Sequence, residues 1–159
     1  MLTDGYGFAG VASSVEVPKI EVATRDYSAA GMAGPIEVRM ARLANALMAK
    51  LTFEGFDPHL YETLDITEGA LIPFTIKGST EDGDGATHAH SIKMRGFLKV
   101  LDEGEWKDGE GVPLKLDMSL RYYKRERDGV ELFEIDQENM VFRVRGNDLL
   151  AQHRTNIAR

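Results

Sequence analysis

Apolar and polar residues alternate along most of the chain, which is typical of β-strands that bury one face. The longest alternation runs from Leu114 to Tyr122. Its apolar face comprises Leu114, Leu116, Met118, Leu120 and Tyr122, and its polar face comprises Lys115, Asp117, Ser119 and Arg121. Further strands are expected at Val15–Val17, Ile20–Val22, Ile36–Met40, Leu47–Phe53, Leu71–Lys77, Ser91–Leu101 (with Ile92, Met94, Leu98 and Val100 on one face), Val130–Asp136 and Val141–Val144.

Turn and helix-capping signals fall between these strands. Asp128-Gly129 suits a two-residue hairpin turn, and the acidic, glycine-rich segment from Asp102 to Gly111 predicts a loop. Asp57-Pro58 predicts the start of a short helix, because aspartate caps helices and proline is tolerated at the first helical position. Asn147 is expected to cap a second helix, Asp148–Ile157.

Composition limits the class of protein. The chain has 159 residues, of which 43% are hydrophobic, so we expect one folded, mostly β (α+β) domain over residues 1–159. It has no cysteine and, at its start, no pattern of a secretory signal, so we expect a soluble protein made in the cytoplasm. The net charge of −7 argues against a protein that grips nucleic acid through its phosphates.

The stretch from Gly78 to His90 places acidic residues and glycines beside two histidines. It suggests a metal site, a phosphate-binding loop or the turn of a long hairpin. A phosphate loop would carry a lysine and lead into a helix. A calcium loop would continue beyond Asp82 and Asp84 to a closing glutamate. Because neither pattern is present, we interpret the stretch as a solvated turn without a bound metal, long enough to contact a partner.

Other candidate chemistry is weak. His88 and His90 would share one face of a strand, which suits a metal, but the sequence indicates no third ligand. The basic cluster from Lys124 to Arg127 is interpreted as a solvated hairpin tip, and no serine lies in a nucleophile elbow. We therefore expect no catalytic, cofactor-binding or metal-binding residue, and no enzyme.

Four stretches, in this order and spacing, span nearly the whole chain and carry a family resemblance. They are Val11–Ile20, Tyr27–Gly34 with its Gly-Met-x-Gly turn, Tyr122-Tyr123-Lys124 followed by Asp128-Gly129 and Glu134-Ile135-Asp136-x-x-Asn139, and Gly146-Asn147-Asp148 with His153-Arg154. The sequence resembles the major tail tube protein of contractile-tailed phages, a family shared with R-type bacteriocins.

This resemblance implies a small β-sandwich or barrel-like subunit with one or two flanking helices. Subunits would form six-membered rings that stack into a hollow tube, with their inner sheets joined around the channel. The implied partners are further copies of the chain, the tail sheath, the tape-measure protein, and baseplate and tail terminator proteins. DNA would pass through the lumen without specific binding, and no membrane binding is expected. The protein would be made in the host cytoplasm and incorporated into the virion tail.

Two segments are expected to reach neighbouring subunits, because both are too irregular in sequence to hold themselves. They are Val17–Gly34, with candidate contact residues Pro18, Tyr27, Gly31 and Met32, and Gly78–His90, with candidates Glu81, Asp82 and Asp84. We also expect acidic side chains to outnumber basic ones on the lumen, since an acidic lining repels phosphates and lets DNA slide.

Three alternatives remain open at this point. The same fold could build the tube of a bacteriocin or another contractile injection device, which carries no genome. A monomeric β-barrel that binds a small ligand would instead have a closed apolar cavity and would not self-assemble. A metal-dependent hydrolase would use His88 and His90.

Overall fold

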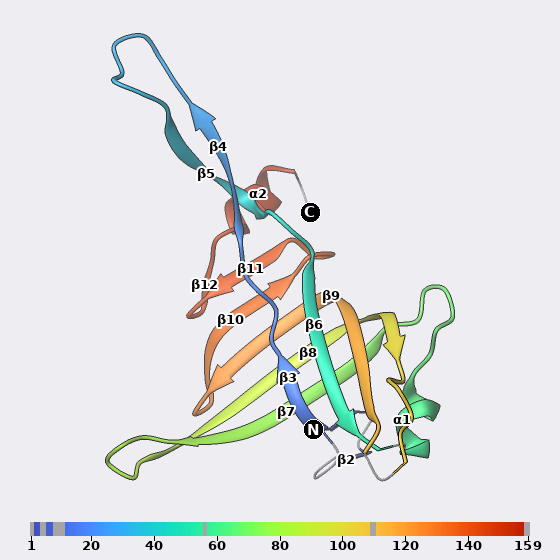
Figure 1. Ribbon diagram of the computed structural model, residues 1–159. Coiled ribbons are helices and arrows are strands. Elements are labelled where there is room, and N and C mark those ends of the chain that lie inside the picture. Colours follow the sequence, from blue (N-terminus) through green and yellow to red (C-terminus); the bar gives the residue numbers. More distant parts are fainter. Residues whose placement is uncertain (1, 4–5, 8–11, 56, 109–110, 158–159) are drawn as a thin grey trace.

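The computed structural model describes residues 2–3, 6–7, 12–55, 57–108 and 111–157, and these form a strand-rich body from which a narrow arm projects (Figure 1). The strands are β1 (Leu2–Thr3), β2 (Tyr6–Gly7), β3 (Ala12–Glu16), β4 (Val22–Tyr27), β5 (Ile36–Leu43), β6 (Leu47–Glu54), β7 (Ile72–Glu81), β8 (Thr87–Asp102), β9 (Pro113–Arg127), β10 (Val130–Asp136), β11 (Val141–Val144) and β12 (Asn147–Asp148). The helices are α1 (Pro58–Thr63) and α2 (Ala151–Asn156).

The long strand β9 organises the sheet of the body. It pairs with β8 along one edge, while its other edge pairs first with β6 and then with β10. The main path runs β12-β11-β10-β9-β8-β7-β1-β2, and β3 adds to the outer edge of β6. The sheet therefore divides at β9, so that β3 and β6 lie in front of β7 and β8 in the view of Figure 1.

The core lies on the apolar side of this divided sheet. Its fully buried side chains come from β6, β7, β8 and β9, joined by Leu60 of α1. They include Leu47, Leu51, Phe53, Phe74, Met94, Leu114, Leu116, Met118, Leu120 and Tyr123. Each large aliphatic or aromatic side chain buried in this way contributes about 1.5–3 kcal/mol to folding.

Two irregularities in the β8–β9 pairing change which side chains face the core. The register shifts between Arg95 and Gly96, where Arg95 pairs with Tyr122 but Gly96 pairs with Leu120. Tyr123, not Tyr122, therefore takes the next core position after Leu120, and the expectation for Tyr122 was wrong. A second shift between Leu98 and Val100 turns Val100 to the surface. Alternation alone cannot reveal such a shift, because an extra residue in one strand exchanges the faces of all that follow.

The first helix is confirmed and the second is shorter than expected. The Asp57 carboxylate accepts a hydrogen bond from the His59 backbone N–H at 2.9 Å, and Pro58 is the first residue of α1. Asn147 and Asp148 do not begin a helix; they pair with β11, so α2 starts only at Ala151. The carboxylate of Asp148 instead accepts a hydrogen bond from the Leu150 N–H.

The mostly β class with two short helices is confirmed, and the sheets are open. Among the described residues, no helix is long and apolar enough to cross a membrane.

Replacing Gly96 by alanine should destabilise the fold. A Cβ at this position would lie 2.2 Å from the Ser119 carbonyl oxygen and 2.8 Å from Leu120 Cα, both of which are backbone atoms. Overpacking of this kind costs about 1–3 kcal/mol or more. Urea unfolding should show the loss for Gly96→Ala, whereas Gly78→Ala, with open space around the new Cβ, is the matched control. Equal midpoints for the two variants would contradict this assignment.

Candidate assembly surfaces

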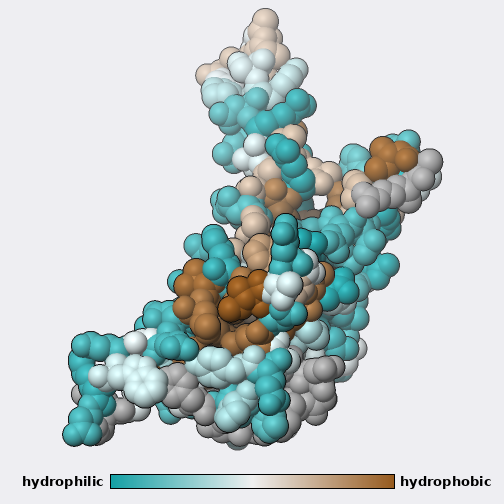
Figure 2. All heavy atoms as spheres, turned by 90° about the vertical axis from the view of Figure 1, so that its right-hand side faces the viewer, coloured by the Kyte–Doolittle hydropathy of each residue, from teal (hydrophilic) through white to brown (hydrophobic). Residues whose placement is uncertain are grey.

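The arm consists of β4 and β5, which pair with each other and form a separate two-stranded sheet. It stands clear of the body in both views (Figure 1, Figure 2). Its base is tied down where the Ala44 N–H donates to the Glu21 carbonyl and the Asn45 amide donates to the Glu21 carboxylate. At its tip, Gly31 adopts a left-handed φ of 93°, which favours glycine.

The arm is amphipathic, and the apolar side chains of its outer part are exposed in the described structure. Tyr27 lies opposite Ile36, and Arg25 lies opposite Val38 on the same face. Tyr27 is 48% exposed and Ile36 is 51% exposed. We call Tyr27, Ile36 and Val38 the arm stripe. Because side chains alternate along strands, the arm stripe forms a continuous apolar surface on one side of the hairpin.

The other face of the arm opposes two carboxylates, since Asp26 lies directly across from Glu37. Like charges in directly opposite positions destabilise a strand pair. An isolated two-stranded hairpin is itself only marginally stable in water. Contact with a partner would therefore stabilise the arm.

The expectation that Val17–Gly34 is irregular was wrong, because much of it is β4 and its hairpin turn. Of the candidate contact residues in this segment, Tyr27, Gly31 and Met32 lie exposed on the arm. Pro18 is buried within the subunit, so its side chain is not presented to a neighbour. Sequence reasoning missed Ile36 and Val38 as partners of Tyr27 and Arg25, because only the hairpin register brings them to one face.

The stretch Gly78–His90 is also more regular than expected. Gly78–Glu81 and Thr87–His90 continue the pairing of β7 with β8, so only residues 82–86 form the turn. Of the three initial interpretations, the long hairpin is the one that the structure has. Its candidate contact residues Glu81, Asp82 and Asp84 are exposed at the tip.

His88 joins this tip to the turn between β9 and β10. Its Nε2 lies 2.9 Å from an Asp82 carboxylate oxygen, and its Nδ1 lies 2.8 Å from an Asp128 carboxylate oxygen. Asp128 is further held to β8 because its other oxygen accepts a hydrogen bond from the Ala89 N–H and its own N–H donates to the Ala89 carbonyl. Arg127 lies within 4 Å of both carboxylates. We call His88, Asp82 and Asp128 the hairpin clasp.

The hydrogen bonds of the hairpin clasp shift the pKa values of His88 and Asp128. The hydrogen bond to Asp128 raises the pKa of His88, with a further contribution from Asp82. The same bond to His88 lowers the pKa of Asp128, supported by the Ala89 N–H. The ring of His90 bonds instead to the Thr80 hydroxyl through Nε2. No group of three or more metal-ligating side chains occurs among the residues that the structure describes.

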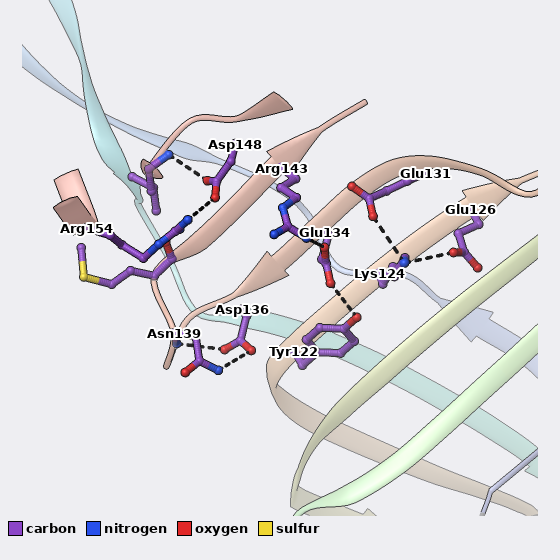
Figure 3. A network of polar contacts seen from close by, with 12 residues as sticks. Tyr122, Lys124, Glu126, Glu131, Glu134, Asp136, Asn139, Arg143, Asp148 and Arg154 are labelled. Atoms are coloured by element: carbon purple, nitrogen blue, oxygen red, sulfur yellow. Dashed lines mark hydrogen bonds and ion pairs between the residues drawn. The ribbon is translucent and has the colours of Figure 1, made fainter. Parts of the chain in front are cut away.

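The polar side of the sheet carries a network of ion pairs (Figure 3). Lys124 contacts Glu126 at 3.1 Å and Glu131 at 3.3 Å, and both contacts raise its pKa. Glu134 accepts hydrogen bonds from the Tyr122 hydroxyl and from Arg143. Burial, reinforced by Glu134, raises the pKa of Tyr122 to about 12. The network fixes the side chains of β9, β10 and β11 on a surface that water can reach.

The network continues to α2 at the end of the sheet. The Arg154 guanidinium donates to the Asp148 carboxylate and to the Met140 carbonyl, so it joins β12, α2 and the β10–β11 turn. Arg154 is the main cause of the lowered pKa of Asp148. Asp136 closes that turn by accepting hydrogen bonds from Asn139.

The sheet also offers free edges. Among the described residues, β7 pairs with β1 only at Thr75, so the outer edge of Ile76–Glu81 has unpaired backbone groups. At the opposite end of the sheet, β12 pairs only with β11. Unpaired edges are templates for another strand. The unpaired backbone groups of β7 and β12 can therefore form hydrogen bonds with a strand of a second copy.

Comparison with known proteins identifies the family. The model of the family described as phage tail tube protein FII matches residues 1–157. The chain belongs to this phage tail tube family. It is 38% identical to the tail tube protein of Escherichia phage P2 over 156 residues, which cover 97% of this chain and 91% of that protein. It is 30% identical to the major tail tube protein of Serratia phage KSP20 over 149 residues, covering 94% of this chain and 86% of that protein.

Membership of the tail tube family gives the exposed surfaces a context. The family is structural and its members are components of the phage tail, so surfaces that meet other subunits are what it requires. The Gly-Met-x-Gly turn lies at the tip of the arm, and Asp128-Gly129 is the turn that the hairpin clasp holds. Motifs that carried the resemblance thus lie on protruding parts of this tail tube chain.

The hairpin clasp should make the hairpin tip sensitive to pH. A raised pKa means that the His88 contribution is complete below its ordinary value of 6.5 and is lost as the pH rises through the folded pKa. The lowered pKa of Asp128 means that its contribution is present above 3.8 and is lost as the pH falls through the folded value. The tip should therefore be held most firmly between these two ordinary values.

An NMR titration of the His88 ring protons tests the clasp. We expect a pKa above 6.5 in the unaltered protein and a clear fall in Asp128→Asn, which removes the largest cause of the shift. Asp84→Asn is the matched control, because it removes the same charge from the same turn without a bond to His88. A His88 pKa that does not respond to Asp128→Asn would show that the clasp is absent in solution.

Proposed function

We propose that this chain is the subunit of the inner tube of a contractile phage tail. Six copies form a ring, and rings stack into a hollow conduit through which the genome passes. The observation that carries the proposal is the arm, on whose apolar stripe Tyr27 and Ile36 are about half exposed in the described part of the chain. Membership of the phage tail tube family supports a second copy of the chain as that cover.

The free edges support closure into a ring. Among the described residues, the edge of β7 is unpaired along Ile76–Glu81, beyond its contact with β1, and β12 lies at the opposite end of the sheet path. Head-to-tail pairing of these two different edges is a heterologous contact, which closes into a ring when the rotation between copies allows it. In this arrangement the sheets of neighbouring subunits join around the channel, and no edge stays open to unrelated strands.

The surroundings of the tube complete the proposal. A contractile sheath lies outside it, and the tape-measure protein lies inside before the genome passes. Baseplate and tail terminator proteins bind its ends. The two relatives are phage proteins, which favours a phage tail over a bacteriocin tube. The interior of the subunit is filled by buried side chains, which argues against the alternative of a ligand-binding barrel.

The sign of charge on the lumen stays a prediction. Where β7 and β8 continue through Tyr122–Arg127 of β9 into β10–β12, the polar face carries basic and acidic side chains in similar number: Lys77, Lys93, Arg95, Lys124 and Arg143 against Glu81, Glu126, Glu131, Glu134, Asp136 and Asp148. If this face lines the channel, the acidic excess must come from residues at its rim, such as the 82–86 turn. A map of the assembled tube with a net basic channel would contradict an acidic lumen.

A charge placed in the arm stripe should block assembly. Ile36→Glu puts a carboxylate into a surface that the proposal buries, and an unpaired buried charge is strongly unfavourable. Sedimentation velocity should show particles much larger than 17.7 kDa for the unaltered protein and mainly monomer for the variant. Thr24→Glu adds the same charge to the other face of the arm, opposite Arg39, and is the matched control. Equal assembly of Ile36→Glu and the unaltered protein would count against the proposal.

Deletion of Glu81–Gly85 tests the second proposed contact. This deletion removes the exposed acidic tip of the β7–β8 hairpin, including Asp82, which contacts His88 in the hairpin clasp. We expect defective or absent tubes under electron microscopy, with the thermal unfolding of the body retained. Tubes of normal form and length would refute a role for this tip in subunit contact.

A further inference from the structure

An apolar groove lies on the side of the body where the loop after α1 projects. It has a volume of about 240 Å³, and its lining includes Ile66, Glu68, Ala70, Phe97, Leu98 and Arg121. We call it the side groove. Figure 2 looks onto this side and shows an apolar area framed by hydrophilic residues. Ile66 is 70% exposed and Phe97 is 40% exposed, so the groove presents large apolar side chains to water.

The loop that forms one wall of the groove is fixed in its outward position. The Asp65 carboxylate accepts hydrogen bonds from the backbone N–H and the hydroxyl of Thr67, and these bonds lower the pKa of Asp65. The Ala70 N–H donates to the Thr67 carbonyl, and Gly69 has a left-handed φ of 88°. Ile66 therefore stays on the surface although it is strongly apolar, which is typical of a surface that binds another protein.

The opposite wall is also held in place. The Arg121 guanidinium lies over the Phe97 ring, 6.0 Å from its centroid, and forms an ion pair with Glu138 at 2.6 Å. Glu68, in contrast, has no hydrogen bond or ion pair within the described part of the chain. The side groove thus combines a rigid apolar floor with a carboxylate at its rim that is available to a partner.

The arm stripe has the matching chemistry. Tyr27 and Ile36 form an exposed apolar pair, and Arg25 lies beside them on the same face. In the described residues, Arg25 forms no ion pair and no side-chain hydrogen bond. An apolar strip with one cation therefore matches an apolar groove with one carboxylate. Complementary charge of this kind sets the register of a contact.

One molecule cannot bring these two surfaces together. The arm extends away from the body, while the side groove lies on the body beside the loop after α1, and both views separate them (Figure 1, Figure 2). A contact between them must join two copies through different surfaces. Such a heterologous contact leaves one arm and one groove free on each new copy, so it propagates into rings or stacks.

We propose that the arm stripe of one copy packs into the side groove of a second copy, with Arg25 of the first facing Glu68 of the second. This inference rests on the proposed function and names the receiving site of the arm. It also explains why Ile66 is exposed on a fixed loop and why Arg25 lies on the apolar face of the arm.

Cysteine cross-linking gives a direct test, because the natural chain has no cysteine. Ile36→Cys and Ile66→Cys are made as separate proteins, mixed, assembled and exposed to a mild oxidant. We expect a disulfide-linked dimer that contains one copy of each variant. Val130→Cys replaces Ile66→Cys in the control, since Val130 is 62% exposed against 70% for Ile66 but lies at the turn between β9 and β10.

Charge reversal gives the second readout. Arg25→Glu should raise the protein concentration needed for assembly by about tenfold or more, because like charges at a contact repel. Glu68→Arg alone should do the same, and the two changes in one chain should restore assembly. Restoration distinguishes a direct pair from unrelated damage, since two independent defects would add.

The outcomes separate this inference from the proposed function. Cross-linking of the Ile36/Ile66 pair above the Val130 control, with rescue by the double reversal, supports the docking. Normal rings or tubes without that cross-link, or without rescue, overturn the docking and leave the tube function standing. A protein that stays monomeric under every condition contradicts both.

Discussion

Burial of one side of β9 holds the subunit together. Leu114, Leu116, Met118, Leu120 and Tyr123 are almost completely inaccessible to water, and they meet apolar residues from β6, β7 and β8. The strand can serve both halves of the sheet only because β8 approaches it closely at Gly96. A side chain at that position would separate the strands. The close backbone contact therefore allows the sheet to divide at β9 and enclose its core.

A body that is closed in this way leaves the remaining elements outside. The arm, the β7–β8 hairpin and the loop after α1 all extend beyond the core, and polar contacts hold each of them. The arm and the loop after α1 expose large apolar side chains to water, including Tyr27, Ile36 and Ile66. A protein that remained a monomer would gain nothing from such surfaces, whereas a protein that assembles uses them as contacts.

Much of the fold follows from the alternation of apolar and polar residues. The strands of the body were expected because burial of one face produces alternating apolar and polar residues, and the helix start was expected from Asp57-Pro58. The arm was not expected as a hairpin, because Val22–Tyr27 lacks alternation and forms a strand by pairing with β5. Tyr123 is buried in place of Tyr122 because of a register shift, which no local sequence pattern indicates. The clasp joins residues that are 40 positions apart, so only the tertiary fold brings them together.

We propose above all that this subunit assembles with copies of itself. Electron microscopy of the purified protein tests it most directly, because rings and hollow tubes are visible without labels. We expect rings of six subunits, or tubes made of such rings, with the arm of each subunit in contact with a neighbouring copy. Uniform monomers at every concentration and salt condition, with the arm exposed to solvent, would contradict it.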